Sequence, residues 1–150
     1  MLFLEAALIY LGSDHGGFKL KETITAHLKE KGIDFEDCGV FNEESVDYPD
    51  IAKSVCERVA AENARGILVC GTGIGMSIAA NKIKGIRAAA VSDIFSAKYC
   101  VAHNNANVLC LGQRVLGNGK ALLLVDEYLN ASFEGGRHER RVGKITSLED

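Results

Sequence analysis

The 150-residue sequence is poor in several features that define other classes of protein. It has one proline, no tryptophan and no strong excess of charge, because 17 basic and 20 acidic side chains give a net charge of −3. This balance provides no general attraction to nucleic acid or to an anionic membrane. No apolar run approaches the roughly 20 residues of a membrane span, and the first residues lack the basic start and long apolar segment of a signal peptide. We therefore expect no nucleic acid and no membrane among its partners.

Cysteine is present, but in a pattern that does not favour disulfides. The five cysteines are odd in number and scattered along the chain, unlike a disulfide framework. Apart from Cys70, they lie in apolar or helical settings, where we expect buried thiols that pack as small hydrophobic side chains. These four are Cys38, Cys56, Cys100 and Cys110. The expected compartment is the reducing cytoplasm.

Apolar strands alternate with amphipathic helical segments along the whole chain. The expected strands are residues 7–11, 33–37, 66–70, 85–91 and 106–111. The expected helices are 18–31, about 49–63, a run through 78–82, about 94–102, and one from about 119 to 129. This order implies right-handed βαβ units, and hence an α/β fold with a parallel sheet covered on both faces. The length suits one domain, residues 1–150, in which a basic tail from 134 to 150 breaks the pattern.

The most informative stretch is residues 67–77. An apolar strand ends at Cys70, and the chain then passes through Gly71, Gly73 and Gly75 into a helix. Glycines let a ligand approach the backbone, and free N–H groups at a helix start bind anions. A thiol in this position has its thiolate stabilised by the amides and by the helix dipole. We therefore predict that Cys70 acts as a nucleophile or base beside an anion hole.

Three sharper templates do not fit this loop. A Walker loop needs a lysine that does not follow Gly75 at the required place. A dinucleotide fingerprint needs glycine, and a cysteine phosphatase loop needs arginine, at the position that Met76 occupies. Asp93 lies about 20 residues further on, which leaves a nicotinamide site as a distant alternative.

Other polar residues follow the expected strands, where ligands bind in open parallel sheets. Asp14 and His15 follow the first strand, Asp93 the fourth and Arg114 the fifth. Asp14 and His15 are equally well explained as a helix cap and a surface histidine. His103, in contrast, sits at the far end of its helix.

Two patterns concern phosphate and metal ions. Arg137 and Arg141 are four residues apart, hence on one face of any helix, and two forked guanidiniums suit a phosphate. The alternative for this tail is a solvated charged face. Cys100 and His103 also share a helix face, but two ligands without two more do not make a metal centre, so we expect no metal.

Six segments of the chain together form a specific pattern. They are residues 13–17, 47–49, 70–81, 85–88, 103–104 and 135–138. They resemble the family of ribose-5-phosphate isomerase type B and galactose-6-phosphate isomerase from about residue 8 to 145, with residues 1–5 as an addition. The resemblance implies a three-layer α/β/α, Rossmann-like fold with a five-stranded parallel sheet and no metal or organic cofactor. It also implies a homodimer or dimer of dimers whose active sites are shared between subunits.

The resemblance further implies catalytic roles. Cys70 looks like the base that moves a proton between C1 and C2, and Thr72 like the hydroxyl that moves protons between O1 and O2. His103 looks like the acid/base that opens the furanose ring, with Asp14 assisting. The amides of Gly71, Gly73 and Gly75, with Ser77 nearby, look like the hole for the enediolate.

The same resemblance implies contacts to a small phosphorylated sugar. Tyr48 and Asn104 look like substrate-contacting residues. Five residues resemble the phosphate ligands of that family: His15, Arg114, Arg137, His138 and Arg141. We therefore expect an enzyme of carbohydrate metabolism, in the pentose phosphate pathway, that interconverts ribose 5-phosphate and ribulose 5-phosphate through an enediolate. Isomerisation of galactose or allose 6-phosphate, or sugar-phosphate binding without catalysis, remain alternatives.

Overall fold

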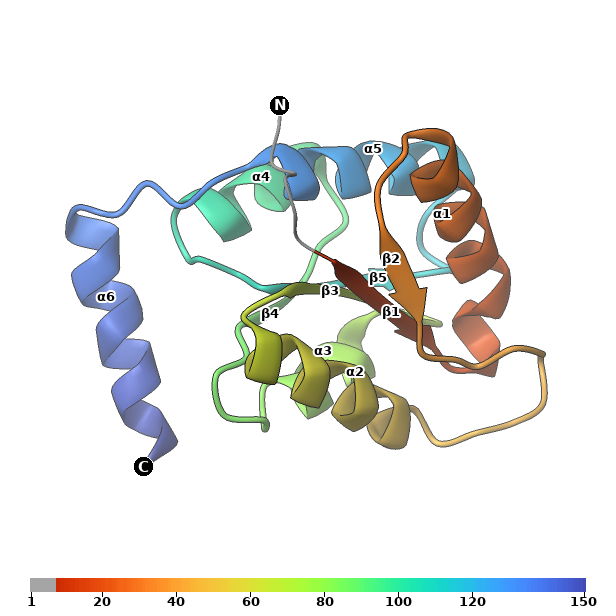
Figure 1. Cartoon of the computed structure of the whole chain (residues 1–150), viewed down its shortest axis with the longest axis horizontal. Helices are drawn as coiled ribbons and strands as arrows, with labels where there is room; N and C mark the ends of the chain where they lie inside the picture. Colours follow the sequence, from red (N-terminus) through yellow and green to blue (C-terminus); the bar gives the residue numbers. More distant parts are fainter. Residues whose placement is uncertain (1–7) are drawn as a thin grey trace.

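Five parallel strands form the centre of the computed structural model, which describes residues 8–150 (Figure 1). Their order across the sheet is β2-β1-β3-β5-β4. The strands are β1 (Ile9–Ser13), β2 (Phe35–Asp37), β3 (Arg65–Cys70), β4 (Ala88–Ala90) and β5 (Val108–Gly112). The predicted five-stranded parallel sheet is thus confirmed. The additional residues 1–5 and the predicted start of the first strand at residue 7 lie outside the described residues.

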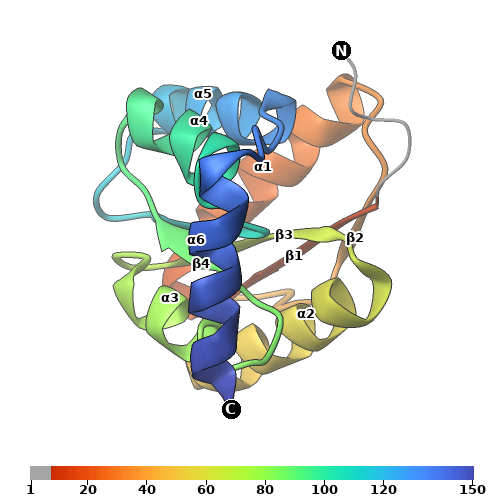
Figure 2. The same cartoon turned by 90° about the vertical axis from the view of Figure 1, so that its left-hand side faces the viewer.

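Helices cover both faces of the sheet, in three α/β/α layers. One face carries α1 (Phe18–Glu30), α4 (Ile94–Ala102) and α5 (Asn118–Asn130), and the other carries α2 (Tyr48–Glu62) and α3 (Ile74–Ala80). Two short 3₁₀ turns are η2 (His15–Gly17) and η3 (Ser147–Glu149). The basic tail forms α6 (Arg137–Thr146), which stands across the β4 edge of the sheet (Figure 2). None of the helices described is long and apolar enough to span a membrane.

The central strands are buried because their side chains serve two cores. All five residues of β1 and of β5 are buried, as expected for parallel strands covered on both faces. Side chains alternate along each strand, so Val69 packs beneath α1, α4 and α5, whereas Leu68 and Cys70 pack beneath α2 and α3. Cys70 therefore ends β3 on the α2–α3 side.

Local sequence signals determine where the helices begin. Pro49 occupies the first turn of α2, as predicted, and Asn63 ends this helix in the left-handed conformation at φ 51°. The Asp93 side chain accepts the Ser96 N–H at 2.7 Å and caps α4, also as predicted.

Three strands start later than predicted, and one of them is β5, which begins at Val108 rather than at residue 106. Gly32 has φ 71° and the Ile33 N–H donates to the Leu28 carbonyl, so residues 32–33 complete the end of α1 before β2 begins. Gly85, with φ 85°, likewise belongs to the loop before β4. In that loop the Arg87 N–H donates to the Asn107 side chain at 2.7 Å, while the Arg87 carbonyl accepts the Asn107 backbone N–H at 2.9 Å.

The chain order places the ends of β1 and β3 side by side at a topological switch point. From β1 the chain continues to β2 on one side, and from β3 it continues to β4 on the other. In open α/β sheets this is where ligands bind. The turn after β1 approaches the backbone of β3 closely, because a Cβ on Gly17 would lie 2.5 Å from the Val69 carbonyl carbon.

Candidate active site

Most of the predicted site residues gather at the carboxyl ends of β1 and β3. The loop after β1 touches the loop after β3, since a Cβ on Gly16 would lie 3.6 Å from the Gly71 nitrogen. Tyr48 packs over Gly75, and the Arg114 side chain lies along Gly71. We call this group the carboxyl-edge cluster: Asp14, His15, Tyr48, Cys70, Gly71, Thr72, Gly73, Gly75, Ser77 and Arg114.

The Cys70 thiol accepts a backbone hydrogen bond. The Gly73 N–H donates to Sγ at 3.1 Å, and Gly73 adopts φ 83°, which favours glycine. This N–H places the positive end of a backbone dipole beside the sulfur. The amide is a direct contact, whereas the sequence-based prediction relied on the dipole of α3, which has only seven residues. The side chain is 5% exposed, so the sulfur lies at the bottom of the loop.

Two hydroxyls follow the thiol in the chain, Thr72 in the loop and Ser77 in α3. Thr72 Oγ1 accepts the Ile74 N–H at 3.2 Å, and Ser77 Oγ donates to the Ile74 carbonyl at 2.8 Å. Both hydroxyls are thereby oriented by the start of α3. The thiol, the Thr72 hydroxyl and the glycine amides that the sequence singled out thus lie in one turn, residues 70–75.

Asp14 and His15 have defined partners. The Asp14 carboxylate accepts the Gly17 N–H at 3.1 Å and caps η2, in agreement with the helix-cap interpretation. His15 Nδ1 lies 3.3 Å from the Val46 N–H and accepts from it. A histidine that accepts at Nδ1 carries its proton on Nε2, so His15 can donate to an anion there.

All five cysteines are free, but their environments differ. Burial raises the pKa of Cys56 to about 12 and that of Cys100 to about 11, so both stay protonated at neutral pH. Cys38 is half-buried, not buried as predicted, because it directly follows the edge strand β2. Burial raises its pKa as well.

The remaining predicted residues form a second group at the opposite end of the strands, where the strands begin. His103 follows the end of α4, and the Glu134 N–H donates to the Ala102 carbonyl at 2.9 Å, which brings the start of the tail to this point. The rings of His103 and His138 stack with centroids 4.1 Å apart. We call this group the amino-edge cluster: His103, Asn104, Glu134, Arg137, His138 and Arg141.

Helix α6 separates its apolar and basic faces. His138 and Val142 are buried, whereas Arg137 and Arg141 are exposed. Within residues 8–150 neither of these guanidiniums forms an ion pair, so both are available to an anion. The predicted pairing of the two arginines on one helix face is confirmed. Burial lowers the pKa of His138, and the neighbouring His103 and Arg137 lower it further.

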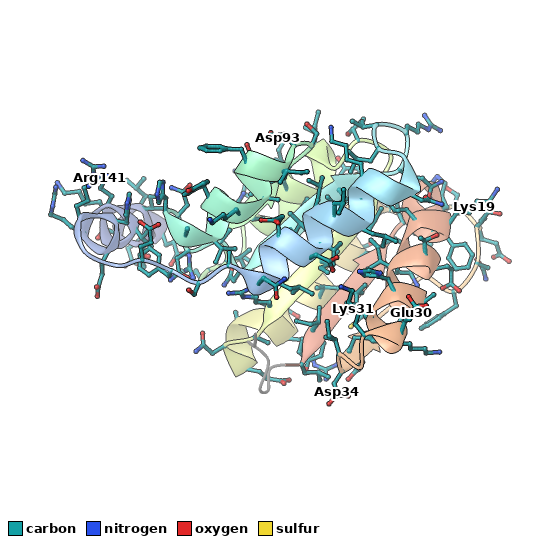
Figure 3. All side chains as sticks on the ribbon, turned by 90° about the horizontal axis from the view of Figure 1, so that it is seen from above. Lys19, Glu30, Lys31, Asp34, Asp93 and Arg141 are labelled. Carbon is teal, nitrogen blue, oxygen red and sulfur yellow. The ribbon has the colours of Figure 1, made fainter. Side chains whose placement is uncertain are left out.

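The two clusters do not meet within one chain. Cys70 is in register with Gly112 at one end of β5, and Gly66 with Val108 at the other end. This length of strand is roughly 13 Å, and His103 precedes β5 whereas Arg114 follows it. Figure 3 shows Arg141 at one extreme of the molecule and Lys19, in the first turn of α1, at the other.

Three residues near these clusters carry contacts that the sequence argument did not assign. A Cβ on Gly112 would lie 2.6 Å from the Thr72 carbonyl carbon, so β5 directly supports the loop after β3. Gln113 Oε1 accepts the Leu20 N–H at 2.9 Å and ties the start of α1 to the end of β5. Glu134 lies between two histidines. For Gly112 the sequence did contain a signal, namely a glycine directly after an apolar run.

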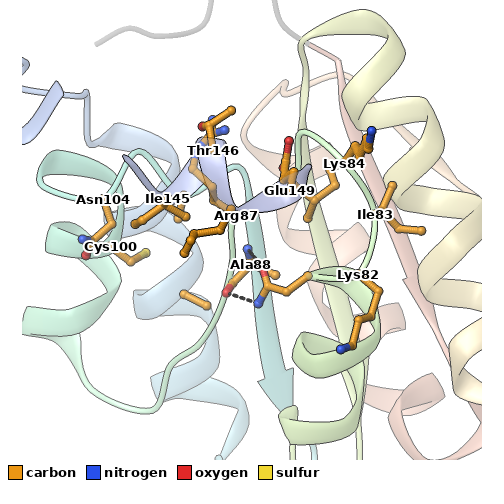
Figure 4. Close-up of a pocket in the computed structure, with 15 residues that line it drawn as sticks. Lys82, Ile83, Lys84, Arg87, Ala88, Cys100, Asn104, Ile145, Thr146 and Glu149 are labelled. Carbon is orange, nitrogen blue, oxygen red and sulfur yellow. Dashed lines mark hydrogen bonds between the residues drawn. The ribbon is translucent and has the colours of Figure 1, made fainter. Parts of the chain in front are cut away.

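A cavity of about 700 Å³ lies between α6 and the loop before β4 (Figure 4). Its lining is mixed, with apolar side chains such as Ile83, Ile86 and Ile145 beside charged ones such as Arg87 and Glu149. Its lining includes Asn104 but none of the carboxyl-edge cluster, so it is separate from the thiol loop.

Comparisons with known proteins give a consistent result. Residues 9–145 match the family described as Ribose/Galactose Isomerase. The chain is 49% identical over 142 residues to ribose-5-phosphate isomerase B of Escherichia coli strain K12, covering 94% of this chain and 95% of that protein. The solved structure of the Clostridium thermocellum ribose-5-phosphate isomerase B superposes with a TM-score of 0.93 at 50% identity, covering 95% and 97% of the two chains. That of the Mycoplasma genitalium ribose-5-phosphate isomerase B with bound ribulose 5-phosphate has a TM-score of 0.92 at 43% identity, covering 96% and 97%.

Proposed function

Because this chain belongs to the ribose/galactose isomerase family, we propose that it interconverts ribose 5-phosphate and ribulose 5-phosphate. The observation that carries the proposal is the Cys70 thiol, with the Gly73 N–H aimed at its sulfur inside a glycine-rich turn. A family relative of the same fold has ribulose 5-phosphate bound. The reaction needs a base beside a weakly acidic carbon, and this turn provides one.

Proton transfer follows from the arrangement around Cys70. The thiolate removes the C2 proton of the open-chain aldose, and the electron pair moves onto the C1 carbonyl oxygen to give an enediolate. The thiol then returns the proton to C1, which leaves the ketose carbonyl at C2. Thr72 moves protons between O1 and O2. It is two residues after Cys70 in the chain, and the Ile74 N–H orients its hydroxyl.

The enediolate oxygen needs donors that are already oriented. The backbone amides of Gly71 and Gly75 supply them, beside the Gly73 N–H that already points at the Cys70 sulfur, since glycine leaves the backbone open to a ligand. Ser77 lies on the same turn. Tyr48, which packs on Gly75, closes one side of this hole and contacts the sugar.

Ring opening and phosphate anchoring use the amino-edge cluster of a second copy. His103 acts as the acid/base that opens the furanose ring, with Asp14 assisting. Arg137, Arg141 and His138 hold the phosphate together with His15 and Arg114, and Asn104 contacts the sugar. An anchor of this kind keeps the reacting carbons beside the base. The active unit is accordingly a homodimer or a dimer of dimers, because the two clusters lie at opposite edges of one chain.

The base is tested by following ketose formation from ribose 5-phosphate with Cys70→Ala. We expect isomerisation to fall to background while folding is retained. Cys38→Ala is the matched control, because Cys38 is a half-buried thiol outside both clusters. Wild-type activity in Cys70→Ala would remove Cys70 as the base. Galactose and allose 6-phosphate, assayed in parallel, decide the length of sugar that the site accepts.

Sharing of the site between two copies is tested by complementation. Cys70→Ala and His103→Ala chains, each inactive alone, are unfolded together, refolded and assayed. Random pairing gives mixed dimers in which one of two sites has neither substitution, so about a quarter of wild-type activity returns. A mixture that stays inactive while re-forming dimers would contradict the shared site.

A further inference from the structure

We propose that His103, Glu134 and His138 form a binding site for a divalent transition metal ion, typified by Zn²⁺, and that the bound metal inhibits the enzyme. Inhibition rests on the proposed function, whereas metal binding does not. The sequence predicts that Cys100 shares a helix face with His103. In the structure, Cys100 instead donates to the Ala97 carbonyl, and the additional ligands come from the tail.

The spacing of the three side chains fits a metal ion better than direct hydrogen bonds. Glu134 Oε1 lies 3.5 Å from His103 Nε2 and 3.7 Å from His138 Nε2. Good N–H···O hydrogen bonds span about 2.7–3.2 Å, so both gaps are long for direct bonding. Two ligand atoms on a tetrahedral zinc, each about 2.0–2.1 Å from the metal, lie roughly 3.3 Å apart. All three ligand atoms are within 4.8 Å of one another. The rings of His103 and His138 are nearly parallel, so they must tilt apart until both Nε2 lone pairs point at one metal, and side-chain rotations on the fixed backbone provide this tilt.

The backbone of each ligand is already fixed. Glu134 is joined to the end of α4 through its N–H bond to the Ala102 carbonyl at 2.9 Å. The His138 N–H donates to the Gly135 carbonyl at 3.1 Å, which sets the first turn of α6. The stacked rings of His103 and His138, inclined by 10°, present their Nε2 atoms to the same carboxylate oxygen. Binding therefore orders little additional backbone, which favours affinity.

The donor set and its exposure define the class of ligand. Two imidazoles and one carboxylate are the ligands of three-residue zinc sites, which keep a fourth position for water or another ligand. Side-chain exposures of 36% for His103 and 53% for Glu134 leave the site accessible in the described chain. Arg137 and Arg141 on the same helix oppose a cation, so the affinity must come from the coordination bonds. A metal on His103 Nε2 occupies the lone pair that ring opening requires.

The test uses full-length protein and the metal alone. Zn²⁺ is titrated against a chromophoric chelator with wild type, Glu134→Ala and His138→Ala, and with Glu139→Ala as control. Glu139 is an exposed carboxylate on the same helix turn, outside the cluster. We expect one zinc per chain in wild type and in Glu139→Ala, and affinity at least about 10-fold weaker in the other two variants. Equal zinc affinity in wild type and Glu134→Ala would overturn the proposal.

Cobalt and kinetic measurements separate this site from alternatives. Co²⁺ bound by two histidines and a carboxylate shows d–d absorption without a thiolate-to-metal band, whereas a thiolate band would assign the metal to a cysteine and overturn the proposal. Zn²⁺ should inhibit wild-type isomerisation reversibly with EDTA, and Glu134→Ala should need at least about 10-fold more zinc. Stoichiometric zinc binding without inhibition would overturn the inhibitory role. A chain without isomerase activity would refute the proposed function but leave the binding result intact.

Discussion

Gly112→Ala offers a direct test of how β5 supports the loop after β3, for which we propose the catalytic role. Gly112 lies at the end of β5, and a Cβ there would approach the Thr72 carbonyl carbon and oxygen at 2.6 Å. Carbon atoms pack at about 3.5 Å or more, so the Thr72 backbone would have to move by roughly 0.9 Å. Cys70 would move as well, because the N–H of Gln113, the residue after Gly112, donates to the Cys70 carbonyl at 2.9 Å. One methyl group outside the catalytic set therefore displaces the thiol and the hydroxyl together.

Two magnitudes follow from this displacement. Forcing a methyl group into a packed site lowers the free energy of unfolding by about 1–3 kcal/mol, and a misplacement near 1 Å lowers turnover by about 10²-fold. The measurements are kcat for ribose 5-phosphate and Tm by circular dichroism.

The matched control for Gly112→Ala is Gly119→Ala in α5. No atom lies within 4 Å of the added methyl group at Gly119, so activity should be unchanged and stability should rise by roughly 0.5–1 kcal/mol. Wild-type kcat and Tm in Gly112→Ala would refute the reasoning that β5 holds the loop in place.

Two further predictions concern stability. Asp37→Ala leaves the fully buried Lys21 ammonium without its nearest carboxylate, so the free energy of unfolding in urea should fall by about 3 kcal/mol. Adding Lys21→Met should recover part of this loss. An unchanged urea midpoint in Asp37→Ala would contradict the prediction. The Ser96 N–H lowers the pKa of Asp93, so this carboxylate stabilises the folded state above its ordinary pKa near 3.8, and the contribution is lost as the pH falls through the lowered value. Asp93→Ala should therefore lower Tm at pH 7, with a deficit that shrinks towards pH 3; a deficit independent of pH would refute the charge argument.

Local patterns in the sequence predicted most of the framework. The five apolar strands with intervening helices follow from periodicity, which reports burial of each segment whatever its neighbours are. Pro49 at the start of α2 and Asp93 as the cap of α4 were predictable, because capping depends on residues within one turn. The tail arginines were placed on one helix face for the same reason. Strand starts at residues 33, 85 and 106 were wrong. Glycine conformations and a side-chain bond to Asn107 decide the first two.

The candidate site required both levels of information. The thiol and glycines of residues 70–75 are contiguous, so the chain itself determined that a cysteine would meet backbone amides. Only the tertiary structure decided that Gly73 donates to the sulfur, that Gly112 presses on Thr72, and that His103 meets Glu134 and His138. These contacts join segments whose separation depends on strand order and helix packing, which no local period encodes. The same packing places the two clusters at opposite edges of one sheet.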